Sequence, residues 1–155
     1  IAHFLSLDEL GVEGARELAA AFGTQGFGGL VDAGIKPLVT LHHFNNPVWF
    51  EDDGGFLRRE STGVFQRYVQ RMVGALDDLC DEWITINEPN IYATHAYYFG
   101  VWPPGIRSLR TLTHVYTNLA AAHIDAYRLI HELQPDARVG VAQHLRVFRP
   151  RIAWH

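Results

Sequence analysis

Apolar runs divide this chain into blocks that predict three strands separated by helices. The first run covers residues 35–44 (IKPLVTLHHF), and shorter runs cover residues 83–86 (WITI) and 138–144 (RVGVAQH). Apolar, β-branched runs of this length are typical of strands that are buried on both faces. Pro37 fits only near the start of the first strand, because proline cannot donate to a strand ladder.

Two amphipathic helices occupy the intervals between these strands. Their apolar side chains recur at spacings of one, three and four residues, which places them on one face of a helix. Ser61 or Thr62 could cap the first helix, and Pro135 closes the second. The apolar faces consist of Val64, Phe65, Tyr68, Val69, Met72, Val73, Leu76 and Leu79, and of Leu112, Val115, Tyr116, Leu119, His123, Ala126, Tyr127 and Ile130.

The remaining segments are less regular. Residues 6–9 (SLDE) fit a capping box for a helix that runs to about Phe22. Glycines crowd residues 23–29, so we expect no rigid element there. A long loop after the first strand contains aromatic side chains of the kind that line or cover a site, namely Trp49, Phe50 and Phe56.

The order of these elements predicts an α/β fold. The connections between consecutive strands are too long for hairpins, so the strands are expected to lie parallel and the connections to carry helices. The chain has 155 residues, of which 48% are hydrophobic and 19% charged, and this is enough apolar material for the core of one domain.

Charge and cysteine content exclude several classes of partner. The 13 Lys and Arg residues against 17 Asp and Glu give a net charge of −4, which leaves no basic excess for nucleic acid or an anionic membrane. No apolar run approaches the ~18 residues of a membrane span. The single cysteine, Cys80, is expected to be buried and fits a reducing, cytoplasmic location. Because the sequence begins at Ile1 without a basic leader, its start is expected to be a cut or processed end.

Polar or ionisable residues lie at the end of each predicted strand. In parallel sheets, active groups project from the carboxyl ends of the strands, so these residues are candidates for a site. The alternative for each is a polar side chain that caps the next turn. The pairs are His42 and His43, Asn87 and Glu88, and Gln143 and His144.

The histidines do not form a pattern that predicts a metal site. His42 and His43 are neighbours on a strand, so their side chains point to opposite faces and cannot clamp one ion. We therefore expect no metal and no cofactor. His123 is expected to be a hydrogen-bonded packing residue within its helix face.

Glu88 is a candidate for proton transfer. It ends a hydrophobic strand, where partial burial would favour the protonated form that a general acid needs. The alternative is an acidic residue placed favourably near a helix N-terminus.

Several segments of the chain together share a pattern with one known family. They are residues 34–44 (GIKPLVTLHHF), residues 46–50 (NPVWF) with residues 54–56 (GGF), and residues 83–90 (WITINEPN). This set resembles glycoside hydrolase family 1, the β-glucosidases and their relatives. The resemblance continues through Trp102–Gly105, the helix with Ala122 and His123, and the strand at residues 139–142, and so covers roughly Leu30 to Pro150.

The resemblance implies part of a (β/α)8 TIM barrel, with strands similar to the third, fourth and fifth of eight. It also implies a retaining β-glycosidase that hydrolyses O-linked β-glycosides. Glu88 matches the acid/base of the family, Asn87 the residue that contacts the sugar 2-hydroxyl, and His43 the histidine that binds the glycone. Such an enzyme needs two carboxyl groups about 5 to 5.5 Å apart, one protonated and one ionised.

The sequence also departs from the family. The family nucleophile lies in a Thr-Glu-Asn-Gly-like block, and no glutamate here is followed by Asn-Gly. Phe44 stands where many members have tryptophan. Because a TIM barrel takes at least ~200 residues, residues 30–155 are expected to form a partial barrel that supplies the acid/base half. Residues 1–29 do not follow the family pattern.

These departures leave a second functional hypothesis open. The alternative to a glycosidase is a non-catalytic carbohydrate-binding or pseudoenzyme fragment, and turnover by the isolated chain is expected to be near background. If a second carboxylate comes from this chain, the first candidates are Glu51, Asp52 and Asp53. The expected partners are a β-linked glycoside and either a second copy or a complementary barrel half.

Overall fold

Three parallel strands form the centre of the fold. The computed structural model describes residues 27–149 and residue 151. The strands β1 (Val39–His42), β2 (Glu82–Asn87) and β3 (Arg138–Ala142) form one sheet in the order β1-β2-β3. Both neighbouring pairs are parallel, which confirms the predicted α/β arrangement.

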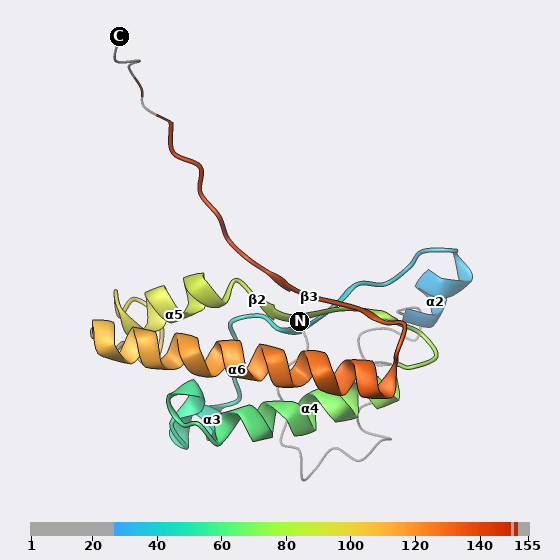
Figure 1. Cartoon of the computed structure of the whole chain (residues 1–155), viewed down its shortest axis with the longest axis horizontal. Helices are drawn as coiled ribbons and strands as arrows, with labels where there is room; N and C mark the ends of the chain where they lie inside the picture. The colour runs from blue at the N-terminus through green and yellow to red at the C-terminus, as the bar shows by residue number, and fades with distance from the viewer. Residues whose placement is uncertain (1–26, 150, 152–155) are drawn as a thin grey trace.

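Helices connect the strands and cover one side of the sheet. The two long helices lie side by side along the strands (Figure 1), and both contribute to the core. Among the described residues, none of the helices combines the length and apolar character needed to cross a membrane. The helices are α2 (Phe27–Asp32), α3 (Val48–Asp52), α4 (Ser61–Ala75), α5 (Pro89–Tyr97) and α6 (Leu109–Leu133), with a short 3-10 helix η1 (Gly55–Leu57).

The core lies between the sheet and these helices. Trp83 is 1% exposed, and its indole Nε1 donates to Gln134 Oε1 at 2.8 Å, so its one polar atom is satisfied. The other face of the sheet is more open, because Leu38 is 57% exposed and Ile84 is only partly buried. The buried side chains of the two long helices are those of Ser61, Phe65, Tyr68, Val69, Met72, Val73 and Ala75 in α4, and of Val115, Asn118, Leu119, Ala122, Ala126 and Ile130 in α6.

The start of α4 differs from the prediction. Neither Ser61 nor Thr62 caps the helix, because each hydroxyl donates to a carbonyl of the preceding turn. Ser61 Oγ bonds to Gly55 O at 2.5 Å, which ties the beginning of α4 to η1. A serine cap occurs instead at α6, where Ser108 Oγ accepts from the amide of Thr111.

Two predictions about irregular segments are wrong. The expectation of no rigid element at residues 23–29 fails for residues 27–29, which lie in α2, where Phe27 packs against the core. The segment after β1 is not a single loop, because it contains α3 and η1. The helix expected at residues 6–22 lies outside the described residues.

The aromatic side chains of this segment mostly do not line a site. Phe50 and Phe56 are 2% and 0% exposed and belong to the core, so that prediction is wrong for both. Trp49 is 38% exposed. Cys80 is buried as expected, with its thiol 3.1 Å from Glu82 O, and burial raises the pKa of this thiol.

Candidate functional site

The carboxyl ends of the three strands bring the candidate residues to one edge of the sheet. The register pairs His42 with Ile86 and Asn87 with Ala142, so all three strands end at nearly the same level. Glu88 N donates to Ala142 O at 2.7 Å and extends the contact between β2 and β3 by one residue. The residues that follow the strands therefore lie at a common end, as the sequence predicted.

Glu88 has an unusual backbone at the junction of β2 and α5. Its φ and ψ are 43° and 56°, the left-handed region, which costs an L-residue of this kind about 1 kcal/mol. Its carbonyl accepts from the amides of Ile91 and Tyr92, whereas its side chain caps nothing. Pro89 suits the first helical position because it has no N–H to leave unpaired.

This backbone leaves the Glu88 carboxylate available for other contacts. The side chain is 32% exposed, so the expected partial burial is present. Oε1 lies 3.4 Å from Nδ1 of His144, which follows β3. The sequence placed both residues at strand ends, but their contact across 56 positions is a product of the fold.

The other predicted site residues lie nearby in the fold. Asn87 ends β2 and is partly buried. His43 follows β1, is exposed, and its ring lies edge-on to Phe44 at 4.8 Å. Gln143 turns toward α6, where its side-chain amide donates to the hydroxyl of Tyr116.

His42 and His43 point to opposite faces, as predicted. His42 is 1% exposed and faces the core, and burial lowers its pKa to about 4. Its Nε2 lies 3.0 Å from Asn46 Oδ1. The Asn46 amide nitrogen is engaged elsewhere, so the neutral imidazole is the donor in this bond.

Asn46 links His42 to a second group of polar side chains. Its Nδ2 donates to Glu51 Oε1 at 2.5 Å and to Tyr92 OH at 2.8 Å. Tyr92 OH in turn lies 3.3 Å from Glu51 Oε1, and burial raises the pKa of this phenol. The sequence marked Glu51 as a candidate carboxylate, but nothing local indicated that Asn46 and Tyr92 would hold it.

A hollow of about 410 Å³ lies above this group of side chains. It combines aromatic rings with amide and carboxylate groups, and the Phe44 and Trp102 rings are 5.0 Å apart. Phe44 follows β1, and Tyr92, which also lines the hollow, lies in the helix that follows Glu88, so the hollow lies at the same end of the sheet as Glu88. Its lining consists of Phe44, Asn45, Asn46, Glu51, Tyr92, Trp102 and Pro103.

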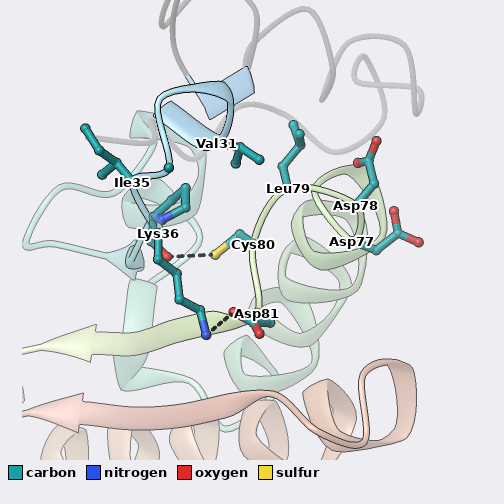
Figure 2. Close-up of a pocket in the computed structure, with 10 residues that line it drawn as sticks. Val31, Ile35, Lys36, Asp77, Asp78, Leu79, Cys80 and Asp81 are labelled. Atoms are coloured by element: carbon teal, nitrogen blue, oxygen red, sulfur yellow. Dashed lines mark hydrogen bonds and ion pairs between the residues drawn. The ribbon is translucent and has the colours of Figure 1, made fainter. Parts of the chain in front are cut away.

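A second hollow of about 420 Å³ lies where the strands begin (Figure 2). Lys36, which precedes β1, pairs there with Asp81 at 2.9 Å and with Glu82 at 3.3 Å. Cys80 also lines it. Because ligands of parallel α/β sheets bind at the carboxyl ends of strands, these ion pairs are best explained as links between the beginnings of β1 and β2.

Metal ligation finds no support in the geometry. Within the part of the chain that the structure describes, no three His, Cys, Asp or Glu side chains gather closely enough to hold an ion. His123 is a packing residue, as predicted, since its Nδ1 lies 2.7 Å from Thr85 Oγ1. Burial lowers the pKa of this imidazole.

Comparison with known proteins shows that the sequence of this chain matches one protein family. The sequence model of a family described as Glycosyl hydrolase family 1 matches residues 17–153. This range begins at residue 17, whereas the expected resemblance begins at residue 30.

Individual relatives are similar over most of this chain. β-Glucosidase A of Acetivibrio thermocellus is 35% identical over 121 residues, covering 78% of this chain and 27% of that protein. A galactolipid galactosyltransferase of Arabidopsis thaliana is 33% identical over 130 residues, covering 76% and 21%. This chain therefore spans about a quarter of the length of these relatives.

The same likeness extends to three dimensions. A solved β-glucosidase from Thermotoga maritima, in complex with deoxynojirimycin, superposes with a TM-score of 0.81 at 27% identity. The superposition covers 88% of this chain and 30% of that one. The sheet and its helices thus have the arrangement of part of a (β/α)8 barrel.

Proposed function

Since this chain belongs to glycosyl hydrolase family 1, we propose that it is the acid/base part of a retaining β-glycosidase, with Glu88 as the general acid and base. The observation that carries the proposal is the conformation of Glu88. Its backbone is bonded to β3 and α5, and its partly buried side chain caps no helix. A carboxyl group held in this way suits proton transfer.

Glu88 would act twice in the reaction. It donates a proton to the glycosidic oxygen as the bond to the aglycone breaks, while an ionised carboxylate attacks the anomeric carbon. It then takes a proton from the water that hydrolyses the glycosyl ester. We propose that the attacking carboxylate comes from barrel residues beyond this chain.

Glu51 is a poor candidate for that nucleophile. Its Oε1 accepts hydrogen bonds from both Asn46 and Tyr92, which tie it to the buried His42. These bonds fix the position of the carboxylate against core residues. We therefore assign Glu51 to the polar contacts beneath the hollow rather than to bond formation.

The proposed substrate is a β-linked glycoside. We assign the glycone contact to His43 and the 2-hydroxyl contact to Asn87, and both residues lie at the same end of the sheet as Glu88. The hollow beside them offers aromatic faces of Phe44 and Trp102 together with the amide of Asn45. Apolar ring faces and a few polar groups are the usual composition of a small-molecule site.

The first test uses the chain alone with an aryl β-glucoside. We expect turnover near background, because protonation of the leaving oxygen without a nucleophile leaves the oxocarbenium ion unstabilised. Rapid turnover that survives Glu88→Gln would contradict the assignment. Sugar binding without turnover, in the chain and in a completed barrel alike, would favour the carbohydrate-binding alternative.

The second test completes the barrel. The matched 121 residues of Acetivibrio thermocellus β-glucosidase A are replaced by the corresponding part of this chain. In this chimera Glu88→Gln should lower kcat by roughly 10² to 10⁴. Azide should restore turnover, since it attacks the glycosyl ester without a general base. Asp52→Asn, a neutralised neighbour of Glu51 on α3, serves as the matched control and should retain activity.

A further inference from the structure

Three side chains form a hydrogen-bonded series that ends on Glu88. Arg146 Nε donates to His144 Nε2 at 3.0 Å. On the other side of the same ring, Nδ1 lies 3.4 Å from Glu88 Oε1. The series runs from the segment after β3 to the junction of β2 and α5.

The partner on one side of the ring determines where the proton lies on the other. A guanidinium can only donate, so His144 Nε2 must accept. The single proton of the neutral imidazole is then on Nδ1, which faces the carboxylate. The distance of 3.4 Å is long for a hydrogen bond, as contacts in ligand-free sites often are before substrate tightens them.

Backbone contacts hold the two residues at this distance. Asn90 Nδ2 donates to the carbonyl of His144 at 2.8 Å, and Glu88 N donates to Ala142 O at 2.7 Å. The first bond joins the beginning of α5 to the segment after β3, and the second joins the residue after β2 to the last residue of β3. The side chains of His144 and Glu88 are 34% and 32% exposed, so each is shielded from water over most of its surface.

We propose that His144 is a positioning residue for Glu88. Its Nδ1–H holds Oε1 and so keeps the carboxyl group in one rotamer, while Arg146 sets the tautomer of the ring. Because Oε1 is the oxygen that is held, Oε2 is left to carry the proton toward the glycosidic oxygen. The catalytic consequence of this arrangement rests on the proposed acid/base role of Glu88. The hydrogen bonds themselves do not depend on that role.

The tautomer can be read directly in the chain labelled with ¹⁵N. Long-range ¹H–¹⁵N correlation at pH 8, where an ordinary imidazole is neutral, should place the His144 proton on Nδ1. Arg146→Leu should move this proton wholly or partly to Nε2. Arg149→Leu, which removes an exposed arginine three residues further along, is the matched control and should leave the tautomer unchanged.

The positioning itself is read from the Glu88 side chain. Its Hα–Hβ couplings should report one rotamer in the native chain and averaged rotamers in His144→Phe. His144→Asn should restore the single rotamer, because the Asn amide nitrogen can take the place of Nδ1. Amide spectra verify that each variant is folded, and the native chain provides a result that needs no variant.

Each of these measurements either supports the positioning role of His144 or overturns it. A proton on Nε2 in the native chain, or averaged Glu88 couplings there, would overturn the proposal. An unchanged tautomer in Arg146→Leu, or an unchanged Glu88 rotamer in His144→Phe, would do the same. None of these measurements uses turnover. A failure of the positioning role can therefore be distinguished from a failure of the acid/base role, which Glu88→Gln tests in the completed barrel.

Discussion

Replacing His42 with glutamine should remove a large part of the acid sensitivity of this chain. The His42 ring meets the rings of Phe56 and Tyr92 edge-on, each at 5.4 Å, and its Nδ1 has no hydrogen-bond partner among the described residues. Burial in these surroundings lowers the pKa of His42 from 6.5 to about 4, because the imidazolium would lose its hydration.

The size of the effect follows from linkage between protonation and folding. The unfolded chain restores the ordinary pKa of 6.5, so between pH 6.5 and pH 4 the unfolded state binds more protons than the folded state. The contribution of His42 to stability is therefore fully present above pH 6.5 and is lost as the pH falls toward 4. With these two values, the loss between pH 7 and pH 5 is about 2 kcal/mol.

The assay is urea unfolding followed by tryptophan fluorescence at both pH values. Glutamine at position 42 retains an amide donor for Asn46 but does not titrate, so the variant should lose about 2 kcal/mol less than the native chain. The control is Asn118→Ala, which removes a buried hydrogen bond of 2.9 Å to Phe56 O. It should lower stability by ~1 to 3 kcal/mol at each pH and keep the native pH dependence. Native pH dependence in His42→Gln would refute the reasoning.

Other expectations concern the backbone and the open sheet. Glu88→Gly should raise the free energy of unfolding by about 1 kcal/mol, because glycine adopts the left-handed conformation without strain; a decrease of that size in urea titration would contradict this. Gly100→Ala should cost ~1 to 3 kcal/mol, since φ is 64° and an added Cβ would lie 2.8 Å from a backbone carbonyl oxygen. Its control, Gly74→Ala within α4, has open space around the added Cβ and should stabilise the chain by ~0.5 to 1 kcal/mol. The open sheet face, where Leu38 is exposed and Ile84 only partly buried, should cause self-association, and light scattering that shows a stable monomer at micromolar concentration would argue against it.

The sequence predicted the regular part of the fold well. β2 was predicted from a short apolar run, and α6 from apolar residues that recur every three or four positions. Each pattern arises from the geometry of its own element. α5 was not predicted from the residues, since it has only nine residues and its buried face consists of proline, alanine and tyrosine rather than strongly apolar side chains. α2 was missed for a different reason: glycines weaken a helix, but packing of Phe27 against the core holds it.

Local sequence likewise predicted one part of the site and not the other. The strand ends that carry Glu88, Asn87 and His43 could be predicted, because the residue that follows a buried strand is a local feature. The role of Glu88 in a glycosidase was inferred from the family resemblance. The local pattern alone was equally consistent with an acidic residue placed near a helix N-terminus.

Only the tertiary structure decided how these groups are connected. The bond from Asn46 to Tyr92 spans 46 positions, and the contact between His144 and Glu88 spans 56. No local pattern encodes such separations, because they depend on strand register and on helices packing over the sheet. The left-handed backbone of Glu88 is likewise maintained by bonds to both β3 and α5. Residue types and local periodicity therefore determined which groups reach one end of the sheet, whereas distances between distant segments determined which of them touch.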